Sequence, residues 1–165
     1  MVEKLLSPRS GLNVSLWLQV GDQIDYDNTR LGDQVYVQPA IRWNINRNFL
    51  LDFSSTFVSL DTKGGEKIFD AGVVDARLTW QFNVRSFLRV TLQQFDTSRN
   101  PDVYLEDVDA ESRDVGRQLL YSYKMNPQTV FFLGYADQYI DEDYLDGLTV
   151  SDRSVFMKIG YAWNL

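Results

Sequence analysis

The strongest constraint in this sequence is a two-residue alternation that recurs in eight segments. In the last of them every second residue from Val155 is apolar, whereas the residues between are mixed. Successive side chains of a β-strand point to opposite faces of its sheet, so the alternation predicts strands with one wholly apolar face. Helical periodicity is nearly absent. We expect an all-β protein with strands near residues 12–20, 34–44, 49–59, 68–82, 87–95, 115–125, 129–139 and 154–164.

Over its central run the apolar half of these segments contains no charged residue, although 24% of the chain is charged. Charges take these alternate positions only toward the long links, where we expect the strands to extend beyond the bilayer, at Asp22, Asp70, Asp96, Arg117 and Asp137. A water-soluble barrel has the opposite arrangement, with its polar face toward solvent. A charge on the lipid-facing side of a membrane barrel costs about 2–4 kcal/mol at the bilayer midplane. The pattern therefore predicts an eight-stranded antiparallel up-and-down transmembrane β-barrel over residues 12–165. Its apolar face, which includes Leu16, Phe53, Leu78 and Ile159, is expected to contact lipid.

The connections between the predicted strands alternate in length. Short links marked by Asn or Pro lie at residues 44–48, 83–86 and 125–128, and the other four links are longer or polar. Outer-membrane barrels have short periplasmic turns and longer extracellular loops. We expect both termini on the periplasmic side, with residues 1–11 as a segment preceding the barrel. That segment lacks the apolar core and the cleavage site of a signal peptide.

Aromatic residues gather toward the ends of the strands that meet the short turns. Such rings favour the boundary between a membrane and water, so we expect them to form an aromatic belt. The predicted belt consists of Trp43, Phe49, Trp80, Phe82, Tyr123, Tyr161 and Trp163.

Charged residues on the polar half of the strands are expected to face the barrel interior. They are Arg42, Asp52, Asp75, Arg77, Arg89, Lys124 and Lys158. Two interpretations remain open: a paired charge network that fills the lumen, or an anion-favouring pore or ligand site. We favour the filled lumen, because buried charges must pair and eight strands leave an interior that side chains fill.

Several classes of function are disfavoured by composition. The chain has no cysteine and no histidine, which removes thiolate or imidazole metal sites and the usual catalytic pairs. Its net charge of −7 disfavours nucleic-acid binding. Acidic loops at residues 96–114 and 140–152 could bind calcium, but the spacing of Asp141, Asp143 and Asp146 lacks the EF-hand pattern. We predict no enzymatic activity, no cofactor and no resident metal.

Three stretches add a family resemblance: Phe87–Val90, Leu119–Tyr135 and Lys158–Trp163. Within and beside the second, YSYKMNPQT and FLGYAD are the most specific pieces. The chain resembles the C-terminal barrel region of a large uncharacterised bacterial family, in which a family-9-like carbohydrate-binding module precedes the barrel. The resemblance implies an outer-membrane location and a shortened barrel corresponding to the tail of a longer member, and it supplies no catalytic residue.

The function we predict is a non-enzymatic scaffold or anchor in the bacterial outer membrane. Its expected partners are the lipid bilayer or detergent and, through the last strand, the outer-membrane insertion machinery; the barrel is expected to be a monomer. Three alternatives stay open. They are a transport channel, as in a porin or as part of a larger glycan-related barrel, a soluble barrel that binds a small apolar molecule, and an outer-membrane enzyme that uses loop carboxylates.

Overall fold

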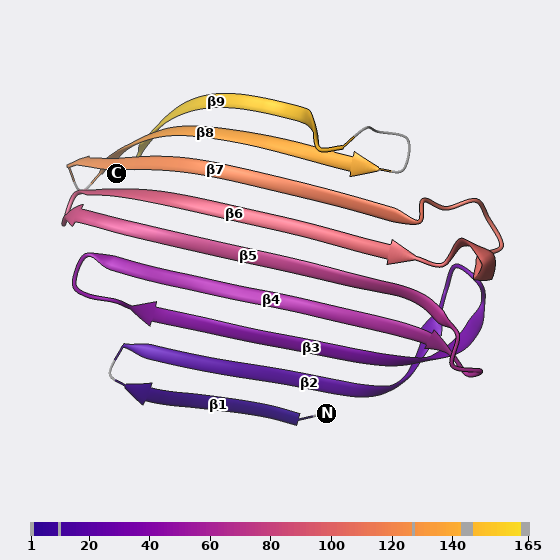
Figure 1. Ribbon diagram of the computed structural model, residues 1–165. Coiled ribbons are helices and arrows are strands. Elements are labelled where there is room, and N and C mark those ends of the chain that lie inside the picture. Colours follow the sequence, from indigo (N-terminus) through magenta and orange to yellow (C-terminus); the bar gives the residue numbers. More distant parts are fainter. Residues whose placement is uncertain (1, 10, 127, 143–146, 163–165) are drawn as a thin grey trace.

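A computed structural model describes residues 2–9, 11–126, 128–142 and 147–162. They form one antiparallel sheet in which each strand pairs with its neighbours in the chain (Figure 1). The strands are β1 (Val2–Arg9), β2 (Leu12–Asp25), β3 (Arg30–Asn44), β4 (Phe49–Thr62), β5 (Lys67–Asn83), β6 (Ser86–Arg99), β7 (Glu111–Asn126), β8 (Thr129–Glu142) and β9 (Thr149–Tyr161). A short 3-10 helix, η1 (Pro101–Val103), lies between β6 and β7. The predicted all-β, up-and-down, antiparallel architecture is confirmed at this level.

The eight predicted strands correspond to β2–β9, and the structure adds β1 to them. Residues 2–9, which we expected to lie outside the sheet, pair with β2 from Val2 opposite Leu18 to Arg9 opposite Leu12. Charged residues and Pro8 interrupt the alternation in this segment, so its sequence gave no strand signal. Among the described residues β9 pairs with β8 alone, so closure of the sheet into a barrel stays a proposal.

Asparagine side chains close the three short turns. Asn46 Oδ1 accepts hydrogen bonds from the backbone of Asn48 and Phe49 at 2.8 and 3.0 Å. Asn83 Oδ1 does the same for the amides of residues 85 and 86, and Asn126 for that of residue 128. Asparagine caps its own turn in this way more readily than most residues do. The predicted short connections therefore form where the sequence placed them.

The longer connections lie at the opposite end of the sheet, and two of them touch. Arg30 Nη2, in the β2–β3 hairpin, donates to Val103 O at 2.9 Å, and Leu105 N donates to Asn28 Oδ1 at 2.9 Å. This contact spans β4 and β5, so the sheet must curl to allow it (Figure 1).

The residues buried near this contact show toward which face the sheet curls. Asp25 on β2 and Leu60 on β4 are 4% and 2% exposed, and Ile68, at a β-bulge in β5, is 0% exposed. By register, Asp25 and Leu60 belong to the face that carries Arg42 and Asp52. We call this polar side the concave face and the apolar side the convex face. Leu60 and Ile68 are the fully buried hydrophobic residues of the described chain, so the sheet is a single layer with a small core at one end.

Candidate functional site

The convex face is a continuous apolar surface across eight strands. One row of register partners shows this: Leu12, Trp43, Leu51, Leu78, Val90, Leu119, Tyr135 and Val155 lie side by side from β2 to β9. Many large residues of this face are exposed, among them Leu16 at 43% and Ile159 at 63%. Soluble monomers rarely expose contiguous apolar patches beyond a few hundred Å². We therefore expect the convex face to be shielded from water.

The edge of this apolar surface runs obliquely across the strands. The last apolar residues before the polar strand extensions are, from β2 to β9, Val20, Val35, Phe57, Val74, Leu92, Leu119, Tyr135 and Val155. When the paired residues are followed strand by strand from Val155 on β9, the line arrives on β2 at Leu12. Leu12 lies eight residues before Val20, the edge residue of β2. With a rise of about 3.3 Å per residue and a strand spacing of about 4.8 Å, this offset over seven steps corresponds to a strand tilt of about 40°.

The height of the apolar surface follows from the same tilt. Residues 12–20 of β2 span it from the short-turn end to its upper edge. At a tilt of about 40°, nine residues rise about 23 Å along the axis perpendicular to that edge. Membrane barrels have strands tilted by about 35–45° and an apolar band about 25 Å tall. We call the surface between the two edges the apolar band.

A belt of ion pairs lies on the convex face just beyond the apolar band, at the end with the long connections. Lys63 bridges Asp22 and Asp33, Lys67 pairs with Asp61 and Asp70, and Arg113 pairs with Asp96. Arg117 donates two hydrogen bonds of 2.8 and 2.7 Å to Asp137 and a further hydrogen bond to the hydroxyl group of Tyr139. Hydrogen bonds to Asp22 and Asp33 raise the pKa of Lys63. Sequence parity placed Asp22, Asp70, Asp96, Arg117 and Asp137 on this face; their partners emerge only from the folded structure.

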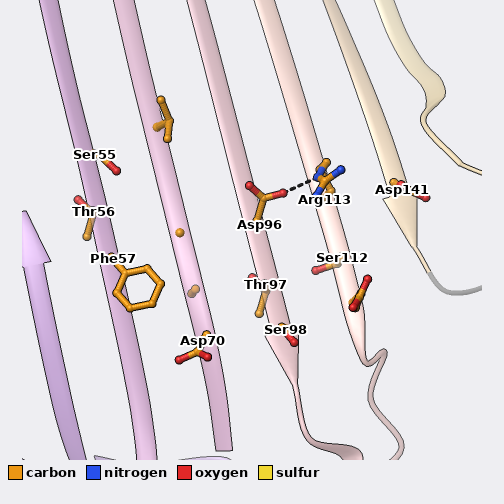
Figure 2. A pocket seen from close by; sticks show the side chains of 14 residues that line it. Ser55, Thr56, Phe57, Asp70, Asp96, Thr97, Ser98, Ser112, Arg113 and Asp141 are labelled. Carbon is orange, nitrogen blue, oxygen red and sulfur yellow. Dashed lines mark hydrogen bonds and ion pairs between the residues drawn. The ribbon is translucent and has the colours of Figure 1, made fainter.

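A shallow hollow of about 670 Å³ opens within this belt (Figure 2). It lies over Gly72 on β5, where an added Cβ would meet no atom within 4 Å. Phe57 lines one side and the Asp96–Arg113 pair lines another. The hollow marks the point where the apolar band gives way to charged groups.

Most of the predicted aromatic belt lies together on the convex face near the short turns. The rings of Phe49 and Trp80 stack at 5.5 Å, and those of Trp80 and Phe82 lie 4.3 Å apart. Trp43, Tyr123 and Tyr161 are 43%, 37% and 59% exposed. Trp163 lies outside the described residues. The structure thus gathers the described rings of this set at one edge of the apolar band, and their role as an aromatic belt stays a prediction.

The seven predicted interior charges lie on the concave face, but their pairing is loose. Arg42 Nη1 lies 3.6 Å from Asp52 Oδ1 and Arg77 Nη2 lies 3.9 Å from Asp75 Oδ1. Asp75 accepts a 2.8 Å hydrogen bond from Gln93, which the sequence analysis did not single out. Arg89 donates to Thr79 Oγ1 at 3.3 Å. The side chains of Lys124 and Lys158 make no hydrogen bond or ion pair within the described part of the chain.

No group of three or more acidic side chains in the described ranges is arranged to hold a metal ion. Residues 143–146, which include two of the three candidate calcium ligands, lie outside those ranges. No described helix has the length and apolar character needed to cross a membrane.

These features define a class of protein by fold and surface: a curled, up-and-down antiparallel sheet with an apolar convex face and a charged concave face. No protein-family model, curated protein or solved structure matches the chain. The resemblance noted from the sequence therefore stays a prediction, and the function must be argued from the surfaces themselves.

Proposed function

We propose that this chain is a β-barrel of the bacterial outer membrane and acts as a non-enzymatic membrane-spanning scaffold or anchor. The observation that carries the proposal is the apolar band. Its lack of charge, its height of about 23 Å and its strand tilt of about 40° agree with a lipid-facing surface. A soluble surface would need none of these three properties.

The two ends of the band support the same orientation. Aromatic rings gather at the short-turn end, and such rings favour the level of lipid head groups. The ion-pair belt begins at the other end, where strands of outer-membrane barrels extend beyond the bilayer. Lysine and aspartate side chains can remain hydrated there. The short turns then face the periplasm and the long connections face outside.

The rival interpretation as a soluble barrel for an apolar ligand has less support. Such a protein needs its apolar side chains around an enclosed cavity. Here Leu78 is 38% exposed on the convex face, whereas the concave face carries Arg42, Arg77 and Arg89. The loosely paired charges of the concave face keep the channel alternative open.

Charge substitutions on the apolar band test the proposal. We expect Leu78→Lys and Leu16→Lys, both near the middle of the band, each to destabilise the protein folded in detergent micelles by about 2–4 kcal/mol, because lipid or detergent tails cannot solvate the ammonium group. In a water-soluble sheet the same exposed positions would tolerate lysine within about 0.5 kcal/mol. The measurement is urea unfolding in micelles, followed by tryptophan fluorescence and by the heat-dependent gel shift of unboiled samples.

The matched control is Leu105→Lys, because Leu105 lies in the β6–β7 loop and is 80% exposed. It should leave the unfolding midpoint unchanged. A wild-type chain that folds and stays monomeric in detergent-free buffer, or band variants as stable as this control, would refute the membrane assignment.

A further inference from the structure

The basic residues of the concave face all lie within the depth of the apolar band. Because the upper edge of the band steps down by just over one residue per strand, depth must be counted from that edge on each strand. Counted from the edge residue of each strand, Arg77, Arg89 and Lys158 lie three residues below the edge, Asp52 and Lys124 lie five residues below it, and Arg42 lies seven residues below it. The band itself is nine residues deep on β2, so these residues occupy the middle and lower part of its depth.

We call Arg42, Arg77, Arg89, Lys124 and Lys158 the basic belt. Asp52 is the acidic residue at the same depth, whereas Asp75 lies one residue below the upper edge. The belt therefore carries five positive charges against one negative charge. Rings of arginine and lysine at a narrow point are the arrangement by which pores favour anions.

The hydrogen-bond donors of the belt are largely unused. The guanidinium groups of Arg42 and Arg77 make no hydrogen bond within the described chain, and their carboxylate neighbours lie at 3.6 and 3.9 Å. Arg89 uses one donor on Thr79 and lies over the ring of Phe87, 5.1 Å from its centre. The ammonium groups of Lys124 and Lys158 have no hydrogen-bond or ion-pair partner in the described ranges. Guanidinium groups held in an enclosed site normally satisfy several of their five donors.

A hollow of about 370 Å³ lies between the two arginines that have the freest donors. Arg42 and Arg77 line it together with Asn13, Ser15 and Ser54, whose side chains add neutral hydrogen-bonding groups. The volume suffices for a hydrated tetrahedral or planar anion. Asp52 and Asp75 also line it and oppose anion binding, so the added charge of Arg89 and Lys158 is needed to favour an anion.

We propose that the basic belt binds a small oxyanion of the phosphate or carboxylate class in the barrel interior. The inference rests on the proposed barrel, because closure is what brings β9 and its Lys158 across from β3. Arginine matches the geometry of such anions through paired N–H donors, and lysine adds charge. The interior is thus a selective anion site in addition to a set of paired charges.

The test uses the full chain folded in micelles of a neutral detergent and titrated with inorganic phosphate. We expect saturable broadening of the phosphorus resonance and a measurable binding heat. Arg77→Gln and Arg89→Gln should each weaken binding about tenfold, since each removes a charge-assisted hydrogen bond. Acetate should compete with phosphate if the carboxylate class also binds.

The control is Arg85→Gln, which makes the same change of charge in the exposed β5–β6 turn, outside the belt. Its binding should equal that of the wild type. If a chain that shows the heat-dependent gel shift gives no saturable binding, the proposed anion site is wrong, whereas the proposed barrel is not contradicted. Equal loss in the control variant would also overturn it. A chain that gives no gel shift would overturn both proposals.

Discussion

At the scale of single residues, glycine on the concave face makes room for a ring. A Cβ added to Gly134 on β8 would lie 2.2 Å from the ring of Phe156, its register partner on β9. The ring therefore covers the glycine and packs where a side chain would otherwise stand. This contact joins the last strand to the rest of the sheet through side-chain packing as well as backbone hydrogen bonds.

We expect Gly134→Ala to destabilise the folded protein by about 1–3 kcal/mol, because the ring must leave its position. Combining it with Phe156→Ala should cost less than the sum of the two single changes, since the clash is then absent. Urea unfolding of the four proteins measures this coupling. Gly116→Ala is the control, because its added Cβ would meet only Gln93 at 4.0 Å. Additive effects would show that the ring does not depend on the glycine.

At the scale of elements, the β2–β3 hairpin is held to the β6–β7 loop by a charged residue. Burial would raise the pKa of Asp25, but hydrogen bonds from Asn28 and Arg30 outweigh it and lower the pKa below the ordinary value of 3.8. A carboxyl group with a lowered pKa stabilises the fold above its unfolded-state pKa and loses that contribution as the pH falls through the folded-state value.

Acidification from pH 6 to below 3.8 should therefore loosen the contact between this hairpin and the β6–β7 loop. The amide of Leu105, which donates to Asn28, should exchange faster with solvent once Asp25 is protonated. Native-state hydrogen exchange in micelles measures this. Asp25→Asn should show fast exchange already at pH 6, whereas Asp27→Asn, at an exposed position of the same hairpin, should behave as the wild type. Protection of Leu105 that is independent of pH would contradict the assignment.

The strands were predictable because each one carries its own signal. Two-residue alternation marks one face without reference to any other strand, and asparagine marks the short turns locally. The polar ends of the strands carried no such signal, since alternation fades where Asp22, Asp96 or Arg117 replaces an apolar residue. The structure accordingly extends most strands toward the long connections. Of the partners, Lys63 comes from the β4–β5 turn and Lys67 from the first residue of β5, and the path between them is not fixed by the sequence.

At the scale of the whole molecule, the number of strands determines how the sheet can close. Nine antiparallel strands leave β1 and β9 running in the same direction, whereas β2 and β9 run in opposite directions. Bacterial outer-membrane barrels are antiparallel throughout, with an even number of strands. Closure of that kind requires β9 to pair with β2. In the structure, β1 pairs with the edge of β2 that β9 would need.

The composition of β1 favours its replacement by β9. Lys4 is the register partner of Leu16, which puts a charged residue type in the middle of the apolar band. Pro8 removes one backbone donor from the same strand. In β9 the corresponding positions hold Met157 and Ile159, which suit contact with lipid. Sequence alternation could not reveal this competition, because it describes each strand but not the edge that the strand selects.

Pairs of introduced cysteines separate the two arrangements, since the chain contains no cysteine of its own. If β9 closes the barrel, residues level with each other on β2 and β9 come together, and L16C with I159C should form a disulfide in micelles. K4C with L16C should then fail to cross-link, because β1 has left the edge. L133C with M157C, which join positions already paired between β8 and β9, should cross-link in either arrangement. A disulfide between positions 4 and 16 without one between 16 and 159 would establish the open nine-stranded sheet as the folded state and rule out closure through β2.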